Sequence, residues 1–299
     1  MLLKVGILGS GSWGRALAVL CAEAGSQPFI GYKNTLPRGF KGSTSLSYVV
    51  KETDLVLIAV PPSKIRDVIR EAQLGPQNLV VIAARGLEPQ SHSWLSSIVL
   101  EESSALRVGA IAGPVLAEEV INRRPTAMVV GSQYDEINRK TQAALHSVQC
   151  RVYSTSDILG VELASAMNKG IGVALGIVDG LQQGVGVRGV VITRGVAEST
   201  RLGQKLGAKE HTFAGLAGVG DLVSCGLMPS HQGYAAGLEL AKGGACPEGL
   251  IRELTSLVTL AQKHEVHIPL TKGILAIALG KIKPQLALDK LMRRAATEE

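Results

Sequence analysis

Gly9-Ser10-Gly11-Ser12-Trp13-Gly14 is the stretch that decides the fold of this chain. An apolar run typical of a buried strand, residues 3–8, precedes it, and residues 15–24, which are typical of a helix, follow it. A Gly-x-Gly-x-x-Gly motif between a strand and a helix is the fingerprint of a dinucleotide-binding site. The pattern therefore predicts a βαβ unit that begins almost at residue 1.

Each glycine of this motif has a predicted role. Gly9 would allow the tight turn, Gly11 would let a pyrophosphate approach the backbone, and Gly14 would let helix and strand pack closely. The N-terminus of the helix would offer free N–H groups to the phosphates. The alternative is a glycine-rich turn in an α/β protein that binds no nucleotide.

Length and composition indicate a globular protein of about two domains, since the chain has 299 residues, 46% of them hydrophobic and 19% charged. The net charge of +6 suits a small anionic ligand. The basic residues are dispersed and have no aromatic residues among them, so we expect no nucleic-acid partner.

The four cysteines, Cys21, Cys150, Cys225 and Cys246, are scattered and form no Cys-x-x-Cys motif. This spacing predicts reduced thiols in a cytoplasmic protein, with neither a disulfide framework nor a metal site. No apolar run reaches 18 residues without a charge, and the first strand leaves no room for a signal peptide, so we expect no membrane insertion.

The chain changes character near residue 154. Before it, apolar runs typical of strands alternate with helical segments, which predicts an α/β fold with a doubly wound sheet. The expected later strands are residues 28–32, 54–60, 78–84, 108–112, 126–131 and 151–153. We therefore predict a dinucleotide-binding domain over residues 1–154 and an all-helical substrate domain over residues 155–299.

The second half carries no strong strand pattern. Residues 158–181 are apolar on most faces and rich in Gly and Ala, which predicts a central helix that is buried on all sides. A further helix is expected over residues 190–206, a glycine-rich turn over residues 215–220, and two or three amphipathic helices over residues 248–294. Apolar, glycine-rich helices of this kind also make a homodimer plausible.

The end of the second strand bears on the choice of cofactor. An acidic residue there usually holds the ribose hydroxyls of NAD, but this chain has Tyr32-Lys33-Asn34, with Arg38 and Lys41 nearby. Cations at this place favour the 2′-phosphate of NADP. A solvated basic loop is the alternative, so the cofactor is predicted to be NADP or NAD.

Short motifs are spread along nearly the whole chain, at residues 9–14, 113–120, 125–127, 179–181, 193–195, 215–222, 248–249 and 291–294. Together they resemble the motifs of the bacterial-type NAD(P)-dependent glycerol-3-phosphate dehydrogenases. The resemblance implies an N-terminal Rossmann domain, a C-terminal helical domain with the substrate between them, and interconversion of dihydroxyacetone phosphate and glycerol 3-phosphate for phospholipid synthesis.

The resemblance places the family's cofactor contacts on Ser12, Trp13, Ala117 and Glu248. A family lysine that contacts cofactor and substrate falls on Arg85, which keeps the charge but has a planar fork instead of a point charge. The family's Gly-Pro-Ser turn, a substrate contact, becomes Gly113-Pro114-Val115 here, so Val115 removes a hydroxyl.

The family's catalytic lysine is the largest departure. Ungapped alignment places Asn168 at that position and Lys169 at the asparagine that follows it in the family. Neighbouring helical side chains point about 100° apart, so Lys169 does not simply replace the lost amine. It would act only if its long stem or an irregular helix brought it back, and otherwise it is an ordinary ammonium in solvent or paired with a carboxylate.

The family's phosphate-binding Ser-Arg-Asn motif falls on Ser230-His231-Gln232, which lacks the arginine that binds phosphate with two hydrogen bonds. The family's aspartate remains as Asp221. We therefore expect Lys169 and Asp221 to be the charged pair of the site, with Lys169 donating the proton that a reduced carbonyl needs. His231, with an ordinary pKa near 6.5, is the alternative acid, or else an exposed loop residue.

Three functional hypotheses follow. The first is a reductase of a small ketone such as dihydroxyacetone phosphate. The second is a protein that binds the dinucleotide without catalysing the family's reaction, and the third is an enzyme whose substrate carries no phosphate. Convergence of Lys169 and Asp221 on one cleft would favour the first hypothesis. Lys169 in solvent, with Asn168 lining a neutral cleft, would favour the second.

Overall fold

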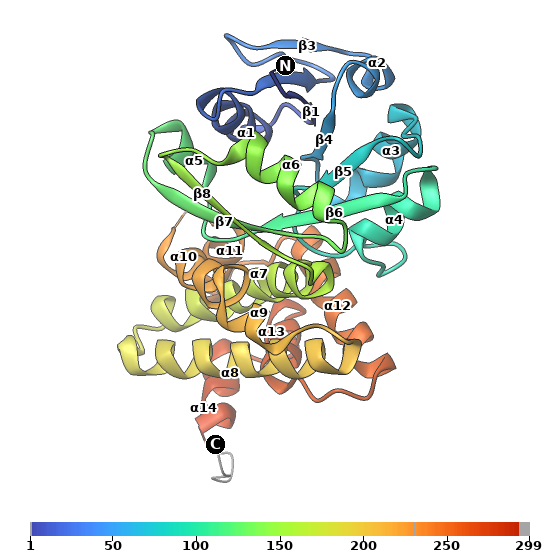
Figure 1. The fold of residues 1–299 in the computed structure, drawn as a ribbon. Coiled ribbons are helices and arrows are strands. Elements are labelled where there is room, and N and C mark those ends of the chain that lie inside the picture. Colours follow the sequence, from blue (N-terminus) through green and yellow to red (C-terminus); the bar gives the residue numbers. More distant parts are fainter. Residues whose placement is uncertain (1, 230, 293–299) are drawn as a thin grey trace.

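The computed structural model describes residues 2–229 and 231–292, and it divides into a sheet layer and a helical layer (Figure 1). The sheet comes from the N-terminal half of the chain, and helices α8, α13 and α14 lie on the side of the long helix α7 that is away from the sheet. This is the predicted α/β architecture with a helical second half.

One sheet of eight strands has the order β3-β2-β1-β4-β5-β6-β7-β8. Every neighbouring pair is parallel except β6 and β7, which are antiparallel. The order reverses between β1 and β4, and such a switch point leaves a crevice at the carboxyl ends of the strands. The strands are β1 (Lys4–Leu8), β2 (Gln27–Gly31), β3 (Lys41–Ser43), β4 (Leu55–Ile58), β5 (Leu79–Ile82), β6 (Arg107–Ala112), β7 (Thr126–Gly131) and β8 (Cys150–Thr155).

Helices cover both faces of the sheet, which explains why its central strands are apolar without alternation. Alternate strand residues such as Ile7, Leu57 and Val81 form a core with α1, α5 and α6, whereas Ile58 and Ile82 pack with α2, α3 and α4 on the other face. These helices are α1 (Ser12–Glu23), α2 (Leu46–Lys51), α3 (Ile65–Ala72), α4 (Leu95–Glu102), α5 (Ala117–Ile121) and α6 (Asp135–Leu145), with the short turn η1 (Pro62–Lys64) before α3.

The helical half surrounds α7 (Ile158–Gly180), as predicted from its composition. By length and composition α7 is the one helix of the described residues that could span a membrane, but 94% of its apolar window is buried inside the protein. The other helices are α8 (Gly184–Leu206), α9 (Glu210–Ala214), η2 (Leu216–Gly220), α10 (Asp221–Leu227), α11 (Gln232–Ala241), α12 (Glu248–Lys263), α13 (Pro269–Ala278) and α14 (Pro284–Met292).

Glycines bring α7 and α11 into backbone contact. A Cβ on Gly176 would lie 2.1 Å from the carbonyl oxygen of Tyr234, and a Cβ on Gly237 would lie 2.1 Å from that of Val173. Neither position accepts a side chain, so the two helices pack more closely than ordinary residues allow.

Three details differ from the sequence-based expectations. The edge strand β3 and helix α2 were not expected, because Lys41-Gly42-Ser43 carries no apolar pattern. Helix α8 begins at Gly184 and not near residue 190, since its first turns are rich in Gly and Val. Residues 215–220 are not an open turn, because η2 forms a π-helical turn that leads directly into α10.

Candidate active site

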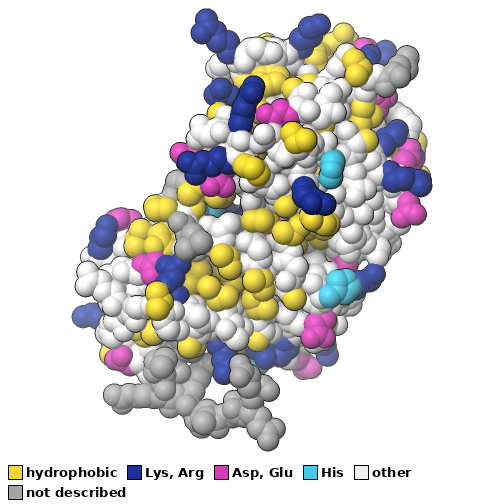
Figure 2. Space-filling model, turned by 60° about the vertical axis from the view of Figure 1, so that its left-hand side comes forward, with side chains coloured by type: hydrophobic (Ala, Val, Ile, Leu, Met, Phe, Trp, Pro, Cys, Tyr) yellow, Lys and Arg dark blue, Asp and Glu magenta, His cyan; other side chains and the backbone are white. Residues whose placement is uncertain are grey.

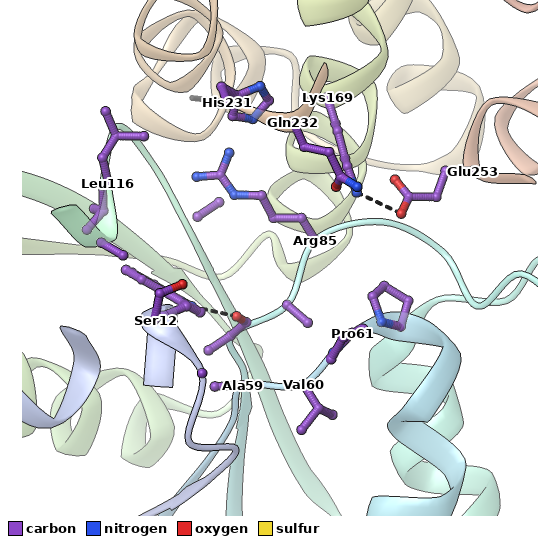
Figure 3. Close-up of a pocket in the computed structure, with 18 of the residues that line it drawn as sticks. Ser12, Ala59, Val60, Pro61, Arg85, Leu116, Lys169, His231, Gln232 and Glu253 are labelled. Atoms are coloured by element: carbon purple, nitrogen blue, oxygen red, sulfur yellow. Dashed lines mark hydrogen bonds and ion pairs between the residues drawn. The ribbon is translucent and has the colours of Figure 1, made fainter. Parts of the chain in front are cut away.

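A cleft of about 1000 Å³ lies where the carboxyl ends of β1, β4, β5 and β6 meet the helical half. Figure 3 shows Ser12, Ala59 and Val60 on the sheet side, with Lys169, His231 and Gln232 opposite them and Arg85 between the two groups. The cleft thus joins the predicted nucleotide loop to residues of α7, α11 and α12.

The glycine loop has the geometry that its sequence predicts. Gly9 has a φ of +126°, and a Cβ there would lie 2.3 Å from the carbonyl oxygen of Ala59. A Cβ on Gly14 would lie 1.9 Å from the carbonyl oxygen of Gly9, whereas a Cβ on Gly11 would meet nothing within 4 Å. The open space beside Gly11 adjoins the N-terminus of α1, which has no side-chain cap, so the loop fits a pyrophosphate group.

The other predicted cofactor contacts line the same cleft. Trp13 donates a hydrogen bond from Nε1 to the carbonyl oxygen of Ala83, 2.7 Å away, which ties the loop to the end of β5. Ala117 begins α5. Glu248 begins α12, where its exposed carboxylate pairs with Arg252.

Arg85 follows β5 and faces a buried carboxylate. Its Nη1 lies 2.8 Å from Oδ1 of Asp221, and its Nη2 donates to the carbonyl oxygen of Gly113 at 3.1 Å. Asp221 is fully buried at the start of α10. The buried Asp221 carboxylate therefore neutralises the charge of Arg85 on the side of the guanidinium that is away from the cleft.

Asn168 belongs to this buried cluster. Its Nδ2 lies 3.1 Å from Oδ2 of Asp221 and 3.0 and 2.9 Å from the carbonyl oxygens of Ala217 and Gly218 in η2. Burial raises the pKa of the Asp221 carboxyl, against the lowering effects of Arg85 and Asn168. Burial alone would lower the pKa of Arg85, but Asp221 raises it above its usual value, so the guanidinium stays charged.

Lys169 does not pair with Asp221, so the predicted charged pair is wrong. Its Nζ donates to Oε1 of Glu253 on α12 at 2.7 Å, and the two side chains are only 13% and 14% exposed. The turn of the helix separates neighbouring side chains by about 100°, so Asn168 faces η2 while Lys169 lines the cleft. Lys169 thus lines the cleft and is paired with a carboxylate, which was the alternative expectation, whereas Asp221 is fully buried and does not line the cleft, so the two residues do not converge on it.

His231 is neither an exposed loop residue nor an acid with an ordinary pKa. It precedes α11, and its Nε2 lies 3.2 Å from Sγ of Cys225, while its buried Nδ1 has no hydrogen-bond partner among the described residues. Burial lowers its pKa to about 4, helped by the positive charges of Arg85 and Lys169. The imidazole is therefore neutral at physiological pH and contributes no charge toward a phosphate.

The remaining predicted substrate residues lie close to this group. Val115 is buried and lines the cleft, as do Gly113 and Gln232, the first residue of α11. Ser230 lies outside the described residues. Among the described residues, no group of three or more His, Cys, Asp and Glu side chains could hold a metal ion.

Sequence reasoning missed Glu253 and Cys225. Glu253 lies five residues beyond Glu248 on a helix with many charges, and nothing in its local sequence distinguishes it.

On the surface, Lys and Arg side chains are interspersed with acidic ones over the face shown in Figure 2.

Comparison with known proteins agrees with this geometry. Residues 30–138 match the family model for the NAD-dependent glycerol-3-phosphate dehydrogenase N-terminus, and residues 157–289 match the model for the C-terminus. The chain is 31% identical to the glycerol-3-phosphate dehydrogenase [NAD(P)+] of Streptomyces griseus, with 99% of this chain and 98% of the relative covered. It is 32% identical to that of Bacillus subtilis, with 99% and 96% covered.

Among solved structures, the glycerol-3-phosphate dehydrogenase of Coxiella burnetii superposes with a TM-score of 0.89 at 28% identity. That match covers 98% of this chain and 99% of the other. The full-length similarity agrees with the geometry, in which the glycine loop lies at the switch point of the sheet and the helical half forms the other side of the cleft. The chain belongs to the NAD-dependent glycerol-3-phosphate dehydrogenase family.

Proposed function

We propose that this protein is a cytoplasmic NAD(P)-dependent oxidoreductase that interconverts dihydroxyacetone phosphate and sn-glycerol 3-phosphate, a reaction that supplies phospholipid synthesis. The observation that carries the proposal is that one cleft contains both the open glycine loop and the ammonium of Lys169. We assign residues 1–154 to dinucleotide binding and residues 155–299 to the substrate.

The loop at Gly11 and the N-terminus of α1 would hold the pyrophosphate, with Ser12, Trp13, Ala117 and Glu248 as further contacts to the dinucleotide. The dinucleotide, when bound, supplies the hydride. The exposed Lys33, Arg38 and Lys41 near the end of β2 favour a 2′-phosphate, so NADP(H) is the preferred cofactor in this proposal.

Lys169 is the proton donor in this scheme. Arg85 hydrogen-bonds the substrate from the end of β5, while Asp221, which accepts a hydrogen bond from Asn168, holds the guanidinium on its buried side. Gly113, Val115, His231 and Gln232 shape the substrate end of the cleft, and Ser230, outside the described residues, is proposed as a further substrate contact from the sequence alone. Because the side chains of Lys169 and Arg85 are only 13% and 26% exposed, they stabilise a developing alkoxide more effectively than they would in water.

The test is oxidation of NADPH and of NADH by the purified protein with dihydroxyacetone phosphate, beside a Lys169→Met variant. We expect turnover in the unmodified protein and a loss of roughly 10²–10⁴-fold in kcat in the variant, the usual contribution of a general acid. Lys242→Met, which removes an exposed lysine of an ion pair beyond α11, is the matched control. No turnover with tight dinucleotide binding would overturn the assignment of this substrate.

A further inference from the structure

The ion pair between Lys169 and Glu253 joins two neighbouring helices, α7 and α12, at the substrate end of the cleft. Nζ and Oε1 are 2.7 Å apart, α7 supplies the lysine and α12 the glutamate, and both residues line the cleft. Figure 3 shows the two side chains pointing toward one another beside Gln232. We infer that Glu253 is the positioning residue that makes Lys169 a proton donor, an inference that rests on the proposed function.

Glu253 lies against the end of β5. A Cβ on Gly86 would lie 3.5 Å from Cδ and from Oε2 of Glu253, so the carboxylate sits directly over the turn that follows Arg85. The same segment accepts the hydrogen bond of Trp13 at Ala83. Glu253 therefore fixes the ammonium relative to the part of the sheet that also holds the nucleotide loop.

The charges around Lys169 explain why it needs a carboxylate of its own. Arg85 and Lys169 together act on His231, since both lower its pKa, so the two cations share one region of the cleft. The Asp221 carboxylate is already engaged by Arg85 and Asn168. Glu253 supplies the negative charge that holds a second, largely buried cation in place, because an unpaired buried charge is strongly unfavourable.

Reduction of the ketone needs one hydride, which a bound dinucleotide would supply, and one proton, which Lys169 would supply. Hydride reaches the carbonyl carbon, the π electron pair of the C=O bond moves to oxygen, and that pair takes a proton from Nζ of Lys169. The products are the alcohol, the oxidised dinucleotide and a neutral amine, which remains held by Glu253 until it regains a proton from solvent. In the reverse direction the neutral amine accepts the proton of the hydroxyl.

The first measurement concerns the pair itself and needs no activity. Brief labelling of the protein with an amine-reactive reagent, followed by mass spectrometry, reports the reactivity of Lys169. We expect Lys169 to be labelled several-fold faster in Glu253→Gln than in the unmodified protein, because its Nζ is released from the carboxylate. Equal labelling in both proteins would mean that the pair does not hold the ammonium, and would overturn the inference.

The second measurement separates positioning from substrate binding. For Glu253→Gln, which keeps the shape of the side chain, we expect kcat to fall roughly 10–100-fold, since a misplaced catalytic group costs about that much. KM for dihydroxyacetone phosphate and the Kd of NADPH stay within about twofold. Glu253→Asp recovers part of the loss, and formate added to Glu253→Ala restores turnover. The control is Glu239→Gln, which breaks an exposed pair on α11.

An unchanged kcat in Glu253→Gln, in a protein that turns over dihydroxyacetone phosphate, overturns the inference and leaves the proposed function intact. A lowered KM with an unchanged kcat in Glu253→Gln also overturns the inference, because it shows that Lys169 binds an anionic group of the substrate and does not donate the proton. If the unmodified protein is inactive with this ketone, the proposed function fails. In that case Glu253→Gln and the control Glu239→Gln are compared on a ketone that the protein does reduce. Equal rates of reduction by these two variants overturn the inference as well.

Discussion

Arg85 and Asp221 form an ion pair with Nη1 and Oδ1 2.8 Å apart, in which the carboxylate is fully buried and the guanidinium reaches the cleft. The two residues are 136 positions apart and join the end of β5 to the start of α10. The pair therefore links the sheet half of the molecule to its helical half directly beneath the substrate end of the cleft.

Removing either partner of this pair leaves the other as an uncompensated charge. We expect Asp221→Asn to lower the free energy of unfolding by about 3 kcal/mol, in the range for breaking a buried ion pair. The double variant Arg85→Met with Asp221→Asn should recover part of that loss. Urea unfolding of both single variants and the double variant gives the coupling energy. Strictly additive losses would show that the pair does not contribute to stability.

Alanine substitutions at two glycines of the nucleotide loop should affect different properties, dinucleotide binding at Gly11 and stability at Gly14. Gly11→Ala adds a Cβ into open space, so we expect unchanged thermal stability but at least tenfold weaker dinucleotide binding, because the methyl group occupies the space for the pyrophosphate. Gly14→Ala places a Cβ 1.9 Å from the carbonyl oxygen of Gly9, so the folded protein itself should be destabilised. Thermal unfolding and NADPH fluorescence titration measure both. Equal dinucleotide affinity in Gly11→Ala would contradict the assignment.

His231 should titrate far below its ordinary range. Burial and the charges of Arg85 and Lys169 lower its pKa to about 4, so NMR of the imidazole should show an inflection there and not near 6.5. Arg85→Met should raise that pKa, whereas Arg107→Met, at a guanidinium that pairs with Glu136, should not. Because the folded pKa lies below the unfolded one, the stability that neutral His231 provides is present above pH 6.5 and is lost as the pH falls toward 4.

Glu162 should make the protein less stable as the pH rises toward neutrality. Its carboxyl on α7 is buried and accepts hydrogen bonds from the backbone N–H and hydroxyl of Ser96, and burial raises its pKa to about 7. A raised folded pKa gives a stabilising contribution that is complete below about pH 4.5 and is lost as the pH rises to about 7. Urea unfolding at pH 5 and pH 8 should show this loss in the unmodified protein and a smaller one in Glu162→Gln. An equal loss of unfolding free energy between pH 5 and pH 8 in the two proteins would contradict this prediction.

The sheet could be predicted because its central strands are covered on both faces and are therefore continuous apolar runs, as at Leu55–Ile58. The antiparallel direction of β7 could not, since strand direction leaves no mark on the composition of a six-residue strand. The direction depends on the short connection between Ala112 and Thr126, which contains only the five-residue helix α5.

The site was predictable where the motif is local and unpredictable where it is tertiary. The glycine loop needs only residues 9–14, whereas the carboxylate that accepts from Lys169 lies 84 residues further along the chain. Asp221 was expected to be that carboxylate because it matches an aspartate of the family that the sequence resembles. Because neighbouring side chains of a helix point in different directions, Asn168 reaches Asp221, whereas Lys169 reaches Glu253.

The backbone contact between α7 and α11 has a consequence for how this active site can change. Gly176 and Gly237 leave no side chains to compress or expand, so the spacing between the two helices cannot be adjusted by exchanging larger and smaller residues there. Lys169 and Gln232 therefore stand on a frame of fixed dimensions. New chemistry on such a frame can arise only by replacing the side chains that project from it. Asn168 and Lys169 are side chains of that kind, since they project from the same turn of α7 and reach different carboxylates, Asp221 and Glu253.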